Sequence, residues 1–367
     1  MRHGSFTVFI TGGTGLIGRA VIARLLRQHP DVRIAALVRN RERWRSLVTA
    51  LGPLAARVVP VRGDITCDGL ALATGAQHWL QRHSQVVVHL AADTVFSRTH
   101  DEARTVNVDG TRHVLEIANS WQGAERLVHV STAFVAGGRD GLIAEQDNGA
   151  DAGFVNPYEW SKYEAERLVR ECSLPWIILR PSTVACDSIA GTVTQLNALH
   201  FALRLCYQGL AALLPGAEDT PMDVVTTCYV ARAIAAVILR DDLAGETLHL
   251  CAGSRWLGLG ELLDRTFHIW ARDESWKRRG HVRPALTDLA TWRLFTHTVE
   301  ELGDPALRRV THALSHFVPQ LGFPKWFDTS RADAVLGFRA PTVAAYWPRM
   351  VEKLAAVAWE QRCRIAA

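Results

Sequence analysis

The sequence predicts an α/β fold: a doubly wound parallel sheet followed by a smaller, mostly helical C-terminal lobe. Over residues 1–185, short β-rich apolar runs alternate with helical patterns, and no hairpin turn joins consecutive runs. That alternation is typical of βαβ units, which place helices on both faces of a parallel sheet. The unbroken valine run at 86–88 is typical of a strand buried on both faces. After residue 186 long helical patterns dominate, and seven of the twelve tryptophans lie beyond residue 250.

Each element of the first half follows from its local pattern. The run at 6–10 is apolar and short, and Ala20, Ala23 and Leu26 in the next segment recur at helical spacing. Later strands are β-rich runs, and the third is closed by Gly63. The expected strands are 6–10, 33–38, 58–62, 85–90, 126–131 and 176–180, and the expected helices are 19–27, 102–119 and 158–172.

Composition excludes several classes of protein. The chain has 367 residues, of which 48% are hydrophobic and 21% charged, so it is not a disordered chain, a coiled coil or a collagen-like fibre. A net charge of +4 gives no reason to expect nucleic acid as a partner. We expect no secretory signal peptide and no membrane span, because the N-terminus lacks a long apolar region and the most apolar helical candidate, 201–214, is short and contains Arg204.

Cysteine and lysine usage give two further indications. The seven cysteines are widely spaced and contain no CxxC pair, which argues against a disulfide framework or a structural zinc site and favours a reducing, cytoplasmic compartment. Only four of the 41 basic residues are lysines, which is typical of an arginine-rich coding bias. A lysine at a chemically significant position therefore stands out; the four are Lys162, Lys277, Lys325 and Lys353.

A glycine-rich turn directly follows the first expected strand and opens the first helix. The segment 11–18 reads Thr-Gly-Gly-Thr-Gly-Leu-Ile-Gly. Gly12, Gly15 and Gly18 permit a tight turn, a close approach of backbone to a pyrophosphate, and close packing of the helix on the strand. The N–H groups and positive dipole end of the helix then face the phosphates. The strand–turn–helix context predicts a Rossmann-type dinucleotide site.

The end of the second strand selects between cofactors. A carboxylate there would bind the ribose 2′-hydroxyl of NAD, whereas this chain has Arg39 followed by Asn40 and Arg41. An arginine can pair with the 2′-phosphate of NADP, so we predict NADPH as the cofactor. Asp64, after the third strand, could reach the adenine edge, and the alternative is an ordinary turn aspartate.

Tyr158 and Lys162 are four residues apart on an expected helix, so they share one face. A free tyrosine has a pKa near 10, and a nearby ammonium would lower that pKa toward the useful range for acid–base chemistry. Tyr158 could then protonate a carbonyl oxygen as hydride arrives, while Lys162 also bonds the nucleotide ribose. The hydroxyl of Ser131 or Thr132, at the end of the fifth strand, could polarise the same oxygen.

These motifs together resemble the extended short-chain dehydrogenase/reductase family over roughly residues 6–255. The resemblance rests on the glycine turn, Gly63-Asp64, the segment His89-Leu90-Ala91-Ala92, the segment 107–111, the segment 130–133, the Tyr158/Lys162 pair and 180–182. It implies Thr132, Tyr158 and Lys162 as catalytic residues. The cofactor contacts that it implies are Gly12, Thr14, Gly15, Leu16, Ile17, Arg39, Asp64, Ile65, Ala91, Ala92, Asn107, Ser131, Lys162 and Pro181.

Within that family, several segments resemble the thioester reductase and fatty acyl-CoA reductase branch. These are 37–39, 107–111, 131–137 and 156–166, with Trp160 standing where a polar residue is expected. The branch implies NADPH-dependent reduction of a CoA-bound or carrier-protein-bound acyl thioester to an aldehyde or alcohol. The alternatives are an NADP-dependent dehydrogenase, ketoreductase or nucleotide-sugar epimerase or dehydratase of the same family, and a protein that binds NADP without chemistry.

We expect a nucleotide-binding domain at 1–185, with contributions from about 222–252, and a mostly helical substrate-binding region at 186–367. The first includes a late strand at 247–251. In the second, His312 and His316 have the spacing of metal ligands but lack a third partner, so we expect no metal. The basic stretch 272–283 is expected to be a surface loop, or else a docking patch for an acidic carrier or CoA phosphates. Cys186 and Cys206 are expected to be inert.

Overall fold

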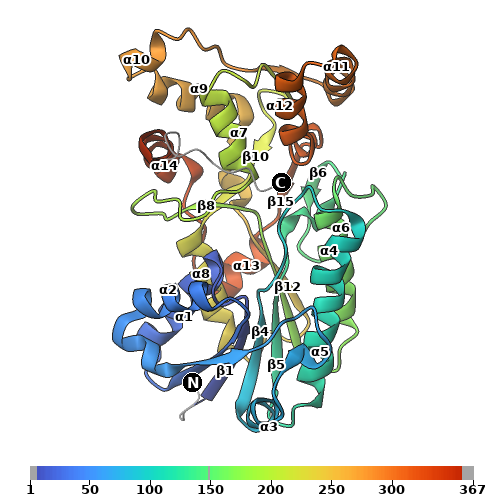
Figure 1. The fold of residues 1–367 in the computed structure, drawn as a ribbon, viewed down its shortest axis with the longest axis vertical. Coiled ribbons are helices and arrows are strands. Elements are labelled where there is room, and N and C mark those ends of the chain that lie inside the picture. Colours follow the sequence, from blue (N-terminus) through green and yellow to red (C-terminus); the bar gives the residue numbers. More distant parts are fainter. Residues whose placement is uncertain (1–5, 148, 358–367) are drawn as a thin grey trace.

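The computed structural model describes residues 6–147 and 149–357, and its centre is a seven-stranded parallel sheet (Figure 1). The strand order is β12-β7-β5-β4-β1-β2-β3, and every neighbouring pair is parallel. The expected fold class is therefore confirmed. The strands are β1 (Phe6–Thr11), β2 (Val32–Val38), β3 (Val58–Arg62), β4 (Ser84–His89), β5 (Arg126–Val130), β7 (Trp176–Pro181) and β12 (Glu246–Leu250).

Helices cover both faces of this sheet. Helices α1, α2 and α8 lie on one side in Figure 1, and α4, α5 and α6 lie on the other. Helix α8 comes from the second half of the chain but packs against α1. The helices of the sheet half are α1 (Leu16–Gln28), α2 (Arg41–Leu51), α3 (Thr74–His83), α4 (His100–Ala103), α5 (Gly110–Ser120), α6 (Pro157–Arg170) and α8 (Thr227–Ile238).

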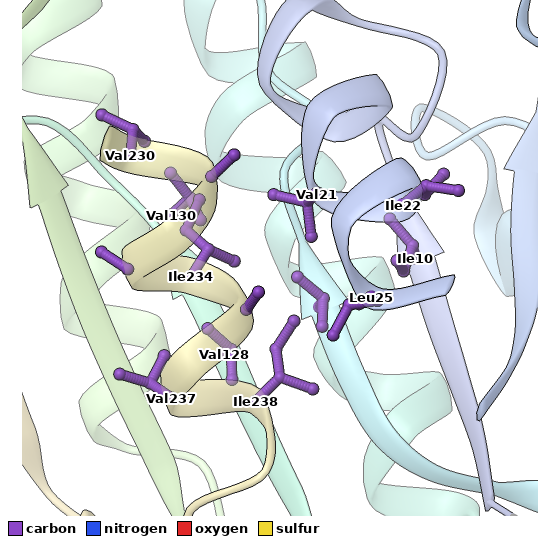
Figure 2. Close-up of a cluster of buried hydrophobic side chains, with 14 of the residues drawn as sticks. Ile10, Val21, Ile22, Leu25, Val128, Val130, Val230, Ile234, Val237 and Ile238 are labelled. Atoms are coloured by element: carbon purple, nitrogen blue, oxygen red, sulfur yellow. The ribbon is translucent and has the colours of Figure 1, made fainter. Parts of the chain in front are cut away.

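Alternating side chains of the strands build one apolar layer on each face of the sheet. Val8 and Ile10 belong to the cluster under α1 and α8, whereas Phe9 belongs to the cluster under α3 and α5. Figure 2 shows the first cluster, where Val21 and Leu25 of α1 lie beside residues of α8 above the sheet. Burial of these side chains, at roughly 25 cal/mol per Å² of apolar surface, fixes the strand ends that carry the site.

A second apolar core lies in the C-terminal lobe and is rich in aromatic residues. Trp270, Trp276, Trp292 and Trp347 are all buried in it. This core packs among helices that stand at the far end of the molecule from α3 in Figure 1. The lobe contains α7 (Ala198–Tyr207), α9 (Leu259–Trp270), α10 (Glu274–Lys277), α11 (Leu289–Leu302), α12 (Pro305–Ser315) and α14 (Val343–Val357), while α13 (Ser330–Leu336) lies against α8.

Short strand pairs join distant segments of the chain, and the sequence patterns did not reveal them. The only late strand expected was 247–251, but two- to four-residue runs also pair: β8 with β11, β9 with β14, β10 with β13, and β6 with β15. Runs this short carry no detectable period-2 pattern. Their bounds are β6 (Gly141–Ile143), β8 (Thr183–Cys186), β9 (Leu213–Pro215), β10 (Pro221–Met222), β11 (Val224–Thr226), β13 (Leu257–Gly258), β14 (Ala285–Thr287) and β15 (Lys325–Phe327).

Two local expectations were wrong in extent, and a third was confirmed with one irregularity. The apolar helix expected at 201–214 ends at Tyr207, because Gly209 takes a left-handed φ of 70° and the chain then turns into β9. The helix expected at 102–119 is confirmed, since the chain is helical from 100 to 120, with a π-helical segment at Arg104–Asp109. The stretch 272–283 is not simply a surface loop, because it contains α10, whose Trp276 is buried in the lobe core.

Candidate active site

The carboxyl ends of β1, β4, β5 and β7 meet at one edge of the sheet, and the predicted site residues follow them. Strand order reverses between β4 and β1, because β2 and β3 continue on one side while β5, β7 and β12 continue on the other. Ligands of open α/β sheets bind in the crevice at such a switch point. The glycine turn after β1 and the segment 89–92 after β4 lie on its two sides.

The glycine turn has the close approaches that require glycine. Gly12 has a φ of 70°, and a Cβ there would lie 2.6 Å from the backbone N of Ala91. A Cβ at Gly18 would lie 2.3 Å from the carbonyl oxygen of Gly12, which explains how α1 packs so closely on the turn. At Gly15 the nearest atom to an added Cβ is 3.3 Å away, and no other heavy atom lies within 4 Å, so this side of the turn stays open for a ligand. The turn therefore fits a dinucleotide pyrophosphate at the start of α1.

Arg39 and Asp64 are brought together at the ends of β2 and β3. An Arg39 Nη1 atom lies 3.6 Å from Asp64 Oδ2, and the arginine side chain is 68% exposed. Asp64 also accepts hydrogen bonds from the backbone N and hydroxyl of Thr66, both at 3.0 Å. The guanidinium is thus exposed to solvent beside Asp64, while the carboxylate is held by its own turn.

Tyr158 and Thr132 form the centre of the candidate site. Tyr158 lies near the start of α6 and is 8% exposed, and the Thr132 hydroxyl is close enough to its phenol to lower the pKa of that phenol. The same Thr132 hydroxyl caps the turn after β5 by accepting from the N–H of Phe134 at 3.3 Å. The ring of Phe96 packs 5.2 Å from the tyrosine ring. One phenol and one alcohol therefore point to a common place above the sheet edge.

The expected lowering of the tyrosine pKa by Lys162 is wrong for the ligand-free protein. Burial raises the pKa of Tyr158 to about 12, the neighbouring Glu159 carboxylate adds to the shift, and the nearby Thr132 hydroxyl opposes it. The phenol therefore keeps its proton at neutral pH. A protonated phenol is the state that can donate to a carbonyl oxygen gaining negative charge.

Lys162 is buried beneath the site and held by β5. Its ammonium donates to the carbonyl oxygen of Val130 at 2.9 Å and lies 3.3 Å from Nε2 of His129. Burial lowers the pKa of Lys162 to about 8, and the Glu166 carboxylate opposes that shift. The pKa of His129 is also lowered, because the ring is buried beside this ammonium, so the imidazole is neutral. A neutral ring can accept a hydrogen bond from the ammonium.

A buried polar chain continues from this lysine across the sheet edge. The rings of His129 and His89, opposite each other on β5 and β4, have centroids 5.3 Å apart. His89 Nδ1 lies 2.7 Å from the Thr11 hydroxyl, and its Nε2 lies 3.0 Å from the Thr111 hydroxyl. This histidine pair fixes β1, β4 and β5 in register below the site. Sequence reasoning used His89 only as part of a motif and missed His129.

The remaining predicted cofactor residues lie along the same edge. Asn107 is 1% exposed and donates to the Asp93 carbonyl and to the Ser161 hydroxyl, both at 2.9 Å, so it ties the segment after β4 to α6. The Thr132 hydroxyl reaches the Pro181 carbonyl at 3.5 Å. Ser131 and Ile65 are buried at the ends of their strands, whereas Thr14, Leu16, Ile17, Ala91 and Ala92 are half-buried in the turn and the segment opposite it.

Other features singled out in the sequence lie away from this centre. Trp160 packs against His100 of α4, with ring centroids 4.9 Å apart. The rings of His312 and His316 are in edge contact at 4.8 Å, and no group of three metal-binding side chains occurs within 6–147 and 149–357. Burial raises the pKa of Cys186 and Cys206 to about 12, which suits inert thiols; Cys363 lies outside the described residues.

A family model for NAD-binding domains, described as "Male sterility protein", matches residues 10–234, more than half of the chain. The chain belongs to this family. Its matched part is a nicotinamide-dinucleotide-binding domain of the extended short-chain dehydrogenase/reductase type. None of the helices described in this chain is both long and apolar enough to cross a lipid bilayer.

Several of the named relatives are reductases. Fatty acyl-CoA reductase 8 of Arabidopsis thaliana is 30% identical over 164 residues, which cover 38% of this chain and 33% of that protein. The L-2-aminoadipate reductase large subunit of Penicillium chrysogenum is 27% identical over 285 residues, 70% of this chain and 20% of that protein. This chain therefore spans a third or less of the length of either relative.

Two solved structures illustrate the structural likeness. The terminal R domain from the myxalamid PKS-NRPS biosynthetic pathway superposes with a TM-score of 0.79 at 26% identity, covering 98% of this chain and 93% of that one. UDP-glucuronic acid 4-epimerase from Bacillus cereus, in complex with NAD, superposes with a TM-score of 0.64 at 18% identity, covering 95% and 99%. The second likeness speaks for the fold alone.

Proposed function

We propose that this chain is an NADPH-dependent reductase that transfers hydride to an acyl thioester, carried by CoA or by an acyl carrier protein, and yields an aldehyde or an alcohol. The observation that carries the proposal is the pair of neighbouring Tyr158 and Thr132 hydroxyls, placed above a buried Lys162 at the sheet edge that holds the glycine turn. The choice of a thioester is supported by the full-length likeness to the myxalamid R domain and by the reductase relatives.

The residues of this chain divide the reaction between them. When bound, the reduced nicotinamide supplies the hydride. As hydride adds to the thioester carbonyl carbon, the Thr132 hydroxyl and the Tyr158 phenol stabilise the growing negative charge on the oxygen, and Tyr158 gives up its proton to it. The hemithioacetal then breaks its C–S bond, so that the thiol leaves with a proton and an aldehyde remains. A second hydride and proton would convert that aldehyde to an alcohol.

The buried cation holds the phenol side of the site ready for this step. Lys162 is anchored by the Val130 carbonyl, so its charge lies directly beneath the segment that carries Thr132. Its ammonium stabilises the phenolate that remains after proton donation. Arg39 would hold the 2′-phosphate of NADPH, since its exposed guanidinium stands at the end of β2 beside the turn.

The test is NADPH oxidation with four classes of substrate: acyl-CoA or acyl-carrier thioesters, aldehydes, ketones and nucleotide sugars. We expect thioesters to release a thiol and to form an aldehyde or alcohol, and aldehydes to form an alcohol without thiol release, whereas ketones and nucleotide sugars should not be turned over. Tyr158→Phe should lower kcat by about 100- to 10,000-fold, the usual contribution of a general acid. Turnover of ketones or nucleotide sugars without thiol release would overturn the thioester assignment and favour the dehydrogenase or epimerase alternative.

A further inference from the structure

Two buried polar residues at the start of α6, Asn156 and Glu159, are hydrogen-bonded to each other, and Glu159 is also hydrogen-bonded to the half-buried Gln320 of a distant segment. Glu159, next to Tyr158 on α6, is 1% exposed. One of its carboxylate oxygens accepts from the side-chain amides of Asn156 and Gln320, and the other accepts from the N–H of Val155 at 2.9 Å. Gln320 belongs to a turn more than 150 residues further along the chain. A buried carboxylate beside the catalytic tyrosine is therefore satisfied in part by a distant segment.

The same distant segment also reaches the end of the loop that carries Thr132. Lys325 of β15 is 6% exposed, and its ammonium donates to the carbonyl oxygen of Gly137 at 2.7 Å and to Oε1 of Gln320 at 3.0 Å. Gly137 closes the 3-10 turn that begins after Thr132, and its N–H bonds the Phe134 carbonyl. Gln320 therefore accepts from Lys325 and donates to Glu159, which makes one continuous chain.

Backbone contacts hold this segment in place along its length. We call residues 316–327 the strap. At its start the His316 carbonyl accepts from Asn156, the N-cap residue of α6, at 3.3 Å. Near its end the Pro324 carbonyl accepts from the N–H of Gly141 at 2.8 Å, and β15 then pairs with β6 beside α6 (Figure 1). The strap thus contacts both α6 and the loop that follows Thr132.

The buried charges of Glu159 and Lys325 explain why the strap holds one position against α6 and the Thr132 loop. Burial raises the pKa of the Glu159 carboxyl and lowers the pKa of the Lys325 ammonium, and each charge opposes the other's shift. Removing one partner would leave the other charge buried and uncompensated, which is costly. We call the hydrogen-bonded series Glu159–Gln320–Lys325 the relay. The relay therefore favours one position of α6 relative to the Thr132 loop over displaced positions.

We infer that the strap sets the spacing between Tyr158 and Thr132, with Gln320 and Lys325 as positioning residues. This inference rests on the proposed function, in which those two side chains act on one oxygen. Neither Gln320 nor Lys325 touches the reacting atoms. They act by fixing the ends of the two elements that do, and a displacement of about 1 Å in such a site can lower the rate about 100-fold.

The test compares Lys325→Met with a matched control elsewhere. Lys325→Met keeps the side-chain length but loses both donated hydrogen bonds, and Gln320→Met breaks the relay at a half-buried position should the first variant fail to fold. The control is Glu145→Gln, because Glu145 is another buried carboxylate that holds a C-terminal segment, through the N–H groups of Arg331 and Ala332. Lys325→Arg, which keeps the charge and the donors, serves as the conservative variant.

We expect both strap variants to lower kcat for the thioester about 10- to 100-fold while the KM for NADPH stays unchanged, since the glycine turn is untouched. Lys325→Arg should recover part of the loss, and Glu145→Gln should lower only the free energy of unfolding. Amide hydrogen exchange should rise at 132–138 and 157–164 in the strap variants and not in the control. Unchanged kcat and exchange in folded strap variants, or an equal loss of kcat in Glu145→Gln, would overturn the inference. Exchange needs no turnover, so it decides the inference even where the wild-type chain reduces no thioester.

Discussion

The pH dependence of the free energy of unfolding should reveal the cost of burying the charge of Lys162, separately from the other contributions of this side chain. Burial lowers the pKa of its ammonium from 10.5 to about 8 in the folded protein. The unfolded chain therefore binds the proton more tightly than the folded one between these two values. The free energy of unfolding must rise with pH across that window, because stability increases wherever the unfolded state binds more protons. Below pH 8 both states are protonated, and the burial penalty is fully present.

The size of this change in unfolding free energy follows from the shift in the pKa of Lys162. One unit of pKa corresponds to about 1.4 kcal/mol, so the whole window is worth roughly 3 kcal/mol, and about 2 kcal/mol of it is gained between pH of about 7 and about 9.5. Lys162→Met has no such proton. The difference in unfolding free energy between wild type and Lys162→Met should therefore shift by about 2 kcal/mol in favour of the wild type over that interval.

The measurement is urea unfolding of both proteins, without cofactor, at several pH values across that interval. Other titrating groups, including His89, His129 and Glu166 around the ammonium, are common to the two proteins and largely cancel in the difference. The loss of the hydrogen bonds to the Val130 carbonyl and to His129 changes the unfolding free energy of the variant by an amount that does not depend on pH. It therefore does not contribute to the slope of the difference against pH. Parallel stability profiles would refute the claim that a protonated Lys162 is buried at a cost.

Three further outcomes test the rest of the site. Thr132→Ala should lower kcat about 100- to 1,000-fold, the usual loss for one oxyanion donor, with NADPH affinity unchanged in a fluorescence titration. Arg39→Ala should raise the KM for NADPH about 10-fold and leave the KM for NADH unchanged, whereas Arg33→Ala, at the opposite end of β2, should alter neither. Gly12→Ala should lower the free energy of unfolding, measured in urea, by about 1–3 kcal/mol and abolish cofactor binding, because Gly12 has a φ of 70° and the backbone of Ala91 occupies the place of a Cβ. The control Gly75→Ala should not destabilise the protein, because the space around Gly75 is open.

The sheet half could be predicted from the sequence because its signals are local. Each strand is an apolar run of five to seven residues, and the glycine turn sits between the strand and helix that give it meaning. The helix spacing of Tyr158 and Lys162 placed both on α6 in advance. What these residues do with substrate and cofactor stays a prediction, since the catalytic and cofactor assignments await the experiments above.

The lobe and the strap could not be predicted for a physical reason. Their strands are two to four residues long, and they pair with partners that lie up to about 180 residues away in the chain. The network around Glu159 depends on side chains that meet only after the fold has formed. One signal was nevertheless present in the sequence. Lysine is scarce, and two of the four lysines, Lys162 and Lys325, are buried beside the segments that we propose to be catalytic. The second of them went unused in the sequence argument.

Burial accounts for the direction of chemistry that this site favours. The same loss of water that lowers the pKa of Lys162 raises the pKa of Tyr158, so the phenol holds its proton and the cation beneath it is poised to lose one. A site that must remove a proton from an alcohol needs a phenolate before the reaction, and burial opposes that state. A site that delivers a proton to a developing oxyanion needs the phenol, and it gains a stabilised phenolate only afterwards. The protonated phenol of the ligand-free protein is therefore the state that the proposed carbonyl reduction requires of Tyr158.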